Sequence, residues 1–177
     1  MASEKLIETI ESVLQDEIVC IGNQIVKTIS GKEYFLKSGC DSPKYQCEAK
    51  GLKELVLAQS VRVAQVISVG RDYILTEYIR RGTASEGFFM CFGREFARMH
   101  RFRSEYFGFH ENNFIGNNVQ MNLPNEEERT DWAAFYFNKR LLFQYKLAVK
   151  NGYATRELQN GFQRLEKNIE LILNESI

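Results

Sequence analysis

The sequence predicts an α+β fold in which a five-stranded antiparallel sheet precedes a helical region. Two observations support this prediction. The first eighty residues alternate short β-rich runs with helical patterns, in the order helix, three strands, helix, two strands. After Gly82 the pattern becomes helical, with apolar residues at three- and four-residue spacing.

The elements of the sheet region follow from periodicity and turn residues. Residues 3–15 carry apolar side chains at helical spacing. Gly22-Asn23 and Gly31 mark the turns between the first three strands, which we expect to form a meander. Pro43 suits the first turn of a second helix. The expected strands are 18–21, 24–29, 34–37, 63–69 and 73–78, and the expected helix 45–59 has a buried stripe of Cys47, Leu52, Leu55, Val56 and Ala58.

The region after Gly82 is expected to be helical over 85–102, 126–151 and 155–173. Gly152 has the position of a C-terminal cap for the second of these helices. Thr130 is a candidate N-cap just ahead of Asp131. Residues 104–124 are rich in Asn and Gly and predict a loop.

Composition restricts the class of protein. The 177 residues are 44% hydrophobic and 26% charged, which is typical of a globular domain. The net charge is zero, so bulk electrostatics suggest neither nucleic acid nor an anionic membrane as a partner. No apolar run approaches the roughly 20 residues that span a bilayer, and the N-terminus lacks the apolar core of a signal peptide. Four cysteines without a CxxC pair favour reduced thiols and a cytoplasmic location over a zinc site, so no metal ligands are assigned.

Lys37 and Glu48 are the first candidates for chemistry. Lys37 ends the third expected strand, and Glu48 lies in the helix that follows. Kinases use a strand lysine and a helix glutamate in this order to hold the α- and β-phosphates of ATP. Taken alone, the pattern favours the alternative of an exposed lysine and a solvated helix glutamate.

The strand that ends in Thr76-Glu77-Tyr78-Ile79 is the second candidate, because it leaves the sheet towards the helical region. In a kinase such a segment is the hinge between two lobes, and its backbone bonds the edge of the adenine. An ordinary strand leaving a sheet gives the same pattern. Gly22-Asn23-Gln24 has only one glycine, so it fits a hairpin turn better than a glycine-rich phosphate loop.

In their order along the chain, these signals resemble the fructosamine kinase (ketosamine 3-kinase) family, protein-kinase-like enzymes related to aminoglycoside phosphotransferases. The segments that resemble the family's first half are Lys37, Glu48-Ala49-Lys50-Gly51-Leu52, Val61-Arg62-Val63-Ala64-Gln65-Val66 (with Ala64 where proline is usual), Thr76-Glu77-Tyr78-Ile79 and Gly93-Arg94-Glu95-Phe96-Ala97-Arg98-Met99-His100. A second block is peculiar to this family: Phe107-Gly108-Phe109, Asn113-Phe114-Ile115-Gly116, Gln120-Met121-Asn122, Asp131-Trp132, Phe135-Tyr136 and Arg140-Leu141.

The resemblance implies a kinase-like N-lobe over 1–79, a hinge at 80–82 and the first helices of a helical C-lobe over 83–177. It implies ATP-dependent phosphorylation of the 3-hydroxyl of a ketosamine, a sugar adduct on a protein or amine, as deglycation repair. Lys37 and Glu48 would hold the phosphates, Thr76 would be the gatekeeper, and the backbone of Glu77, Tyr78 and Ile79 would meet the adenine. The residues expected on the sugar side are Asn113, Gln120, Asn122, Asp131 and Trp132.

The family's catalytic His-Gly-Asp run and its later magnesium-binding Asp do not occur in this sequence. We therefore expect a truncated chain that transfers no phosphate by itself, whereas the full-length enzyme would use Mg²⁺. The alternatives are a non-catalytic nucleotide-binding or interaction protein and a general sugar kinase relative, against which the second block argues.

Two further expectations concern association. The apolar side chains of 83–177 predict exposed surface or a homodimer through the C-terminal helices. Cys20 lies beside the turn at Gly22, where some family members carry a redox-sensitive cysteine that links two subunits; a buried strand cysteine is the alternative.

Overall fold

The computed structural model describes residues 3–174 and divides the chain into two compact units, Met1–Arg103 and Ser104–Ile177. The hinge expected at 80–82 lies within unit 1, and the division into two lobes at that hinge stays a prediction. Unit 1 contains α1 (Glu4–Leu14), β1 (Ile18–Gly22), β2 (Ile25–Thr28), β3 (Glu33–Ser38), α2 (Lys44–Leu57), β4 (Val66–Val69), β5 (Tyr73–Glu77) and α3 (Phe88–Met99). Unit 2 contains β6 (Asn113–Ile115), β7 (Asn118–Gln120), the 3-10 helix η1 (Glu127–Arg129), α4 (Trp132–Tyr136), the π-helix η2 (Phe137–Leu142), α5 (Phe143–Lys150) and α6 (Arg156–Asn174).

The predicted sheet is confirmed. Its five strands are antiparallel and have the order β1-β2-β3-β5-β4, so the first three form the expected meander. The β1–β2 turn is a two-residue hairpin in which both Asn23 (φ 51°) and Gln24 (φ 66°) adopt the left-handed region that a type I′ turn requires.

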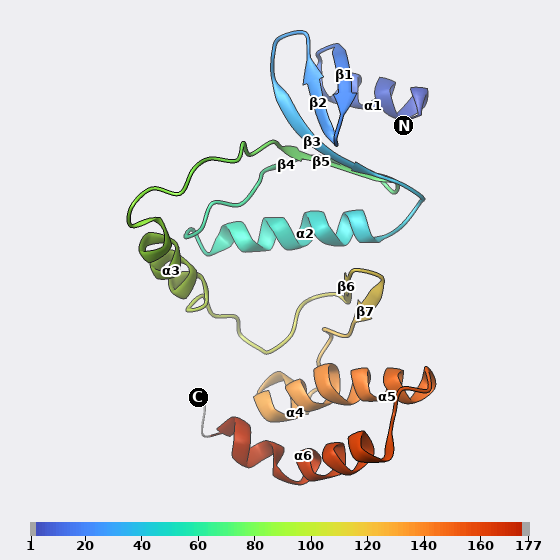
Figure 1. Cartoon of the computed structure of the whole chain (residues 1–177), viewed down its shortest axis with the longest axis vertical. Coiled ribbons are helices and arrows are strands. Elements are labelled where there is room, and N and C mark those ends of the chain that lie inside the picture. The colour runs from blue at the N-terminus through green and yellow to red at the C-terminus, as the bar shows by residue number, and fades with distance from the viewer. Residues whose placement is uncertain (1–2, 175–177) are drawn as a thin grey trace. The chain divides into compact units, whose positions relative to one another are not determined.

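One face of the sheet is covered by α1 (Figure 1). Ser3 caps this helix by accepting a hydrogen bond from the Leu6 backbone N–H. Leu6 and Ile10 of α1 belong to a cluster of buried side chains. Its members from the strands are Val26 of β2, Leu36 of β3, and Tyr73 and Leu75 of β5. Each such aliphatic side chain contributes about 1.5–3 kcal/mol when it leaves water, so this layer holds the sheet and α1 together.

Helix α2 lies on the side of β3 and β5 that α1 leaves open (Figure 1). The buried stripe predicted for this helix is wrong, because Ala49 is the residue that α2 buries while Leu55 and Val56 are 44% and 52% exposed. The helix contacts β4 and β5, and its Glu48 and Leu52 line a pocket together with residues of β3 and β5. This contact keeps Glu48 against the sheet.

Helix α3 is shorter than the predicted 85–102, because Gly87 adopts φ 80° at its start and His100 ends it. Among the described residues of α3 none is buried. Its phenylalanines form a ladder along one side, with ring centroids 6.2 Å apart for Phe88 and Phe92 and 5.6 Å apart for Phe92 and Phe96. The helix therefore owes little of its stability to tertiary burial.

The predicted helix 126–151 begins later. A 3-10 turn at Glu127–Arg129 precedes it, and its cap is Asp131, whose Oδ1 accepts from the Ala134 N–H at 2.9 Å, so the prediction of Thr130 as N-cap is wrong. The helix then runs without a break through α4, η2 and α5, and Gly152 follows its end at φ 77°, as predicted.

The stretch 104–124, predicted as a loop, contains the β6–β7 hairpin. Strands of three residues rich in Asn lack the apolar alternation by which strands are recognised in sequence. Phe135 and Ile169 are buried within unit 2, with 2% and 9% of their surfaces exposed. These two side chains are therefore not part of the exposed apolar surface that was predicted for residues 83–177.

Candidate functional site

Lys37 and Glu48 face each other, as their placement on a strand and a helix predicted. The Lys37 ammonium Nζ donates to Glu48 Oε1 at 2.5 Å. Side chains alternate along a strand, so the burial of Leu36 beneath α1 directs Lys37 to the α2 side. Both side chains stay accessible, with 43% of Lys37 and 38% of Glu48 exposed. The lysine therefore keeps donors that an anion can reach.

A small pocket of about 180 Å³ adjoins this ion pair. Its lining consists of Phe35, Lys37, Glu48, Leu52, Ala64, Ile74 and Thr76. The strand register explains the grouping, because Phe35 is opposite Thr76 and Lys37 is opposite Ile74 across β3 and β5. The pocket combines an apolar lining with one cation and one anion at its wall. Such a combination suits a ligand that has an apolar part and a charged part.

A larger hollow of about 620 Å³ lies on the opposite face, between α1 and the β1–β2 turn. Its described lining includes Leu6, Leu36 and Asp72 but no lysine or arginine. An anionic ligand would meet a carboxylate there without a compensating cation, so the smaller pocket at Lys37 fits a phosphate better despite its size.

Beyond β5 the chain leaves the sheet at Glu77. The Glu77 N–H donates to the Gln65 carbonyl at 2.8 Å, and its carboxylate bonds the Arg62 guanidinium. Among the described residues, the backbone of Tyr78 and Ile79 takes part in no hydrogen bond outside the strand ladder. Tyr78 and Ile79 directly follow the last β3–β5 pair, at the point where the chain leaves the sheet.

Glu33 is a residue that sequence reasoning missed. Its Oε1 lies 3.0 Å from Lys27 Nζ, and its Oε2 accepts from Arg80 Nε at 2.9 Å and lies 2.7 Å from Arg80 Nη2. Hydrogen bonds from Lys27 and then Arg80 lower the pKa of Glu33, and the Glu33 carboxylate raises the pKa of Lys27. Glu33 and Lys27 lie directly opposite each other on β3 and β2. Oppositely charged residues at facing positions of a hairpin are the sequence signal that could have predicted the Glu33–Lys27 contact.

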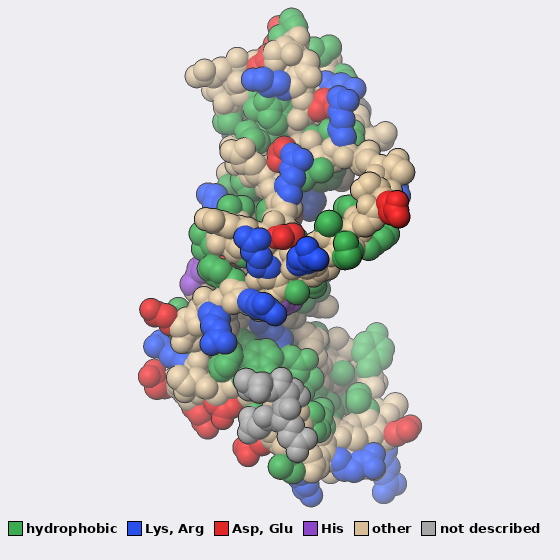
Figure 2. Space-filling model, turned by 90° about the vertical axis from the view of Figure 1, so that its left-hand side faces the viewer, with side chains coloured by type: hydrophobic (Ala, Val, Ile, Leu, Met, Phe, Trp, Pro, Cys, Tyr) green, Lys and Arg blue, Asp and Glu red, His purple; other side chains and the backbone are tan. Residues whose placement is uncertain are grey.

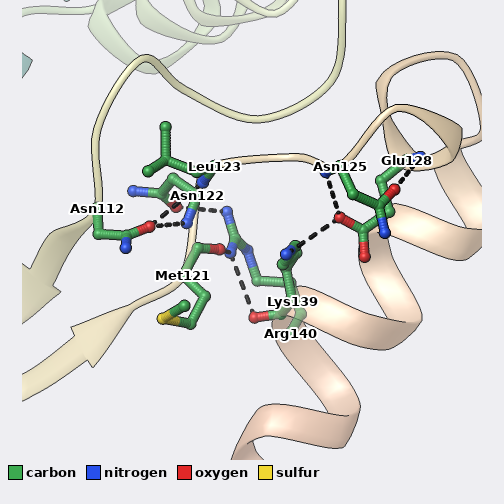
Figure 3. Close-up of polar contacts among 8 residues, drawn as sticks. All are labelled: Asn112, Met121, Asn122, Leu123, Asn125, Glu128, Lys139 and Arg140. Atoms are coloured by element: carbon green, nitrogen blue, oxygen red, sulfur yellow. Dashed lines mark hydrogen bonds and ion pairs between the residues drawn. The ribbon is translucent and has the colours of Figure 1, made fainter.

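In unit 2, Asn122 is the centre of a buried network (Figure 3). Its backbone N–H donates to Asn112 Oδ1 at 2.8 Å, and its side-chain Oδ1 accepts from Arg140 Nη2 at 2.8 Å. Arg140 Nη1 also donates to the Met121 carbonyl at 2.5 Å. The planar guanidinium thus holds two neighbouring acceptors of the segment after β7.

A second polar group of unit 2 surrounds Glu128, which is 2% exposed (Figure 3). Glu128 Oε2 accepts from the Asn125 N–H at 2.8 Å, the Asn125 side chain accepts from the Glu128 N–H at 2.8 Å, and Lys139 Nζ lies 3.1 Å away. Burial acts to raise the pKa of Glu128, but the Asn125 N–H, Lys139 and Asn138 outweigh it and lower the pKa. The reciprocal Asn125–Glu128 bonds form a capping box, which the spacing of the two residues signals in sequence.

The residues expected on the sugar side belong to unit 2 and are distributed over several elements. Asn113 and Gln120 are cross-strand partners in the β6–β7 hairpin. Asp131 uses its carboxylate to cap α4. Trp132 belongs to an aromatic group, with ring centroids 5.3 Å from Phe107 and 5.2 Å from Tyr136. Asp131 and Trp132 thus have structural contacts of their own, and a role at a substrate stays a prediction.

Cys20 lies on the same face as Lys37, opposite Lys27 across β1 and β2, and its thiol is exposed. The alternative of a buried strand cysteine is therefore wrong, while the redox role stays a prediction. Within residues 3–174 no cluster of three His, Cys, Asp or Glu side chains has the geometry of a metal site. No helix in that range is long and apolar enough to cross a bilayer.

Comparison with known protein families agrees with this geometry. The model of the family described as fructosamine kinase matches residues 3–176. A ketoamine kinase of Enterococcus faecium is 29% identical over 144 residues, which cover 78% of this chain and 49% of that protein. The chloroplastic protein-ribulosamine 3-kinase of Arabidopsis thaliana is 36% identical over 111 residues, 59% of this chain and 32% of that protein. The chain spans about half the length, or less, of these curated relatives.

Solved structures show the same fold. A protein assigned as a fructosamine-3-kinase from Thermobifida fusca superimposes with a TM-score of 0.79 at 20% identity, covering 98% of this chain and 62% of that one. A second one, from Haemophilus somnus, gives a TM-score of 0.64 at 17% identity over 91% of this chain and 60% of that one. The sheet and helices are thus those of the kinase-like fold of these enzymes. With the family match extending over nearly all of its residues, the chain belongs to the fructosamine kinase family.

Proposed function

We propose that this chain carries the nucleotide-binding part of an ATP-dependent ketosamine kinase. In this proposal the Lys37 ammonium binds the α- and β-phosphate oxygens, and Glu48 holds the long lysine side chain in the direction of the nucleotide. The observation that carries the proposal is the 2.5 Å Lys37–Glu48 contact on the wall of a pocket that Thr76 also lines.

The energetics favour a positioning role for the ion pair over a stabilising one. Exposed pairs of this kind contribute only about 0.2–1 kcal/mol to folding. A phosphate that displaces water from a half-exposed ammonium gains a charge-assisted contact, and such contacts are roughly twice as strong as neutral ones. Adenine would bond the backbone of Glu77, Tyr78 and Ile79 at the strand end, with Thr76 limiting the depth of the pocket.

The substrate class follows from the family. Curated relatives are a ketoamine kinase and a protein-ribulosamine 3-kinase, so we infer a ketosamine substrate and a role in deglycation. Asn113, Gln120, Asn122, Asp131 and Trp132 are the proposed sugar-side residues. Mg²⁺ would accompany ATP, since metal ions neutralise the charge that develops in phosphoryl transfer.

A 177-residue polypeptide of this sequence should bind nucleotide without transferring phosphate. The sequence contains no His-Gly-Asp run, and phosphoryl transfer depends on a residue that positions the attacking hydroxyl. Incubation with ATP and a fructosamine separates binding from transfer, because turnover by the pure chain would contradict this expectation.

Calorimetric titration with Mg-ATP tests the proposal directly. Lys37→Met should weaken binding about 10- to 100-fold, since one charged hydrogen-bonding group contributes about 1.5–3 kcal/mol. Lys53→Met and Glu54→Gln, on the exposed side of α2, are matched controls that should bind like the parent chain. A parent chain that fails to bind ATP, or a Lys53→Met variant as weak as Lys37→Met, would contradict the proposal.

A further inference from the structure

We propose that Glu33 is a positioning residue for nucleotide recognition, acting through Arg80 on the backbone segment Tyr78–Ile79. The inference rests on the proposed function and deepens it, because it assigns the adenine half of the site to a support different from Lys37 and Glu48.

The first step is the coordination of Glu33. This carboxylate is 15% exposed, much less than its partners Lys27 (52%) and Arg80 (77%). Both of its oxygens are engaged, Oε1 by Lys27 and Oε2 by the Arg80 Nε and Nη2 atoms. Because both of its oxygens are engaged, the Glu33 carboxylate is restrained by two partners. We therefore treat Glu33 as the less mobile side chain of the pair, which restrains the more exposed Arg80.

The second step is the place of Arg80 in the chain. Strand β5 ends at Glu77, whose pairing with Tyr34 is the last rung of the β3–β5 ladder. Glu33 immediately precedes Tyr34, so its carboxylate lies just beyond that rung. Arg80 is three residues beyond the strand end. The Glu33–Arg80 contact therefore ties the departing chain back to β3 after the ladder has stopped.

The third step is that the segment is held at both ends. At Glu77 the backbone N–H donates to the Gln65 carbonyl at 2.8 Å, and the carboxylate bonds Arg62. At Arg80 the anchor is Glu33. Between these points lie Tyr78 and Ile79, which follow the last rung of the β3–β5 ladder. Backbone recognition of a planar ligand edge needs their backbone groups in one orientation, since misplacement of a binding group costs affinity.

The consequence is a division of the site into two independent supports. Glu33 and Arg80 would set the orientation of the segment that meets the adenine, and Lys37 with Glu48 would meet the phosphates. A change in one support should therefore alter affinity for one half of the nucleotide. A merely structural loss at Glu33 would instead weaken both halves together.

Titrations of the 177-residue chain with ATP, adenosine and inorganic tripolyphosphate test this division. Glu33→Gln keeps the size of the side chain and removes its charge. We expect it to weaken adenosine and ATP about two- to fivefold, the range of an exposed ion pair, and to leave tripolyphosphate unchanged. Lys37→Met should do the reverse, weakening ATP and tripolyphosphate and leaving adenosine unchanged.

Arg80→Gln should reproduce the Glu33→Gln pattern. The double variant should lose no more than Glu33→Gln alone, because both changes remove the Glu33–Arg80 contact and only Glu33→Gln also removes the contact with Lys27. Asp41→Asn breaks a different exposed pair, the 3.0 Å contact with Arg71, and is the matched control that should bind all three ligands like the parent chain. Equal weakening of the three ligands by Glu33→Gln, or no weakening of adenosine, would overturn the inference while ATP binding itself stands. A parent chain that binds no ATP would overturn the proposed function and this inference together.

Discussion

At the scale of single residues, two ion pairs of this protein have opposite environments. Lys37 and Glu48 are both more than a third exposed, so their contact contributes little to folding and leaves the lysine free to receive an anion. Glu128 is buried and pairs with Lys139, 20% exposed, so its loss leaves polar groups without compensation. The first pair suits binding and the second suits stability.

Glu128→Gln should reduce the free energy of unfolding by about 1–3 kcal/mol at pH 7, because a buried charged contact is lost. The pKa of Glu128 is lowered in the folded chain, so its contribution is present above the ordinary glutamate pKa of about 4.3 and disappears as pH falls through the lower folded value. The difference between parent and variant should therefore shrink below about pH 4.

Denaturant unfolding from pH 3 to 7 measures this difference. Glu126→Gln is the matched control, since Glu126 is 92% exposed and lies 3.8 Å from Arg129. A Glu128→Gln penalty that stays constant over the whole pH range would show that the lost contribution is steric rather than ionic.

Gly108 is a position where only glycine fits. Its φ is +103°, and a Cβ atom there would lie 2.3 Å from the Asn122 carbonyl oxygen and 3.0 Å from the Phe135 ring. Gly108→Ala should destabilise unit 2 by about 2–4 kcal/mol, combining overpacking with a strained φ. Gly161→Ala, in α6 with open space around it, should instead stabilise by about 0.5–1 kcal/mol. Thermal unfolding compares the two, and a neutral Gly108→Ala would refute the packing argument.

At the scale of elements, the π-helix η2 carries two consecutive side chains, Lys139 and Arg140, that make contacts with different parts of unit 2. Within Phe137–Leu142 the backbone is wider than an α-helix, a feature that occurs mostly as single turns. Lys139 reaches Glu128 near η1, while Arg140 reaches the segment after β7 (Figure 3). One turn of irregular helix thus connects the hairpin and the capped turn to the helical layer of unit 2.

Arg140→Lys should loosen the segment 118–123 without unfolding unit 2. A lysine keeps the charge, but its compact ammonium does not reproduce the planar fork that reaches both Met121 O and Asn122 Oδ1. Hydrogen exchange of the backbone amides should accelerate in this segment, including the Asn122 amide, and stay unchanged in α6. Arg156→Lys at the exposed start of α6 is the control, and equal exchange in the parent and Arg140→Lys would contradict the role given to the guanidinium.

At the scale of the whole molecule, many large apolar side chains are exposed to solvent. Figure 2 shows hydrophobic side chains on the surface, among acidic and basic ones. On α3, Phe88, Phe89 and Phe92 are 46%, 75% and 47% exposed. Exposed apolar patches beyond a few hundred Å² mark interaction surfaces in most proteins. The part of the predicted apolar surface that lies on α3 therefore stays a candidate for association.

We predict that the chain associates with itself through α3 at micromolar concentration, because pairing two such helices removes phenylalanine surface from water. The double variant Phe89→Ser/Phe92→Ser should shift the light-scattering mass towards the monomer. Ile29→Ser, at a side chain that is 69% exposed outside α3, is the control and should leave the mass unchanged. A parent chain that remains monomeric and binds no hydrophobic dye would rule the prediction out.

Local sequence patterns predicted much of the fold, and they predicted the part of the candidate site formed by Lys37 and Glu48. Alternation along β3 places Lys37 on the face that α1 leaves open, and the turn at Asn23 fixes the first hairpin. The helix cap at Asp131 was misassigned by one residue, because Thr130 and Asp131 are both good caps and their backbone angles decide between them. Helix α2 itself was predicted, but its buried stripe was wrong, because apolar residues at helical spacing such as Leu55 and Val56 are exposed.

The sequence by itself determined the order of the elements, the antiparallel sheet, the family and the pairing of Lys37 with Glu48, because each depends on short-range periodicity or on motifs read in order. Only the tertiary structure decided that Glu33 holds Arg80, 47 residues away, and that Arg140 holds Asn122, 18 residues away. Such contacts join charged and amide side chains that are common on any surface, so no spacing rule selects the partners. Chain folding alone brings these few groups within hydrogen-bonding distance, at the end of β5 and beside β7.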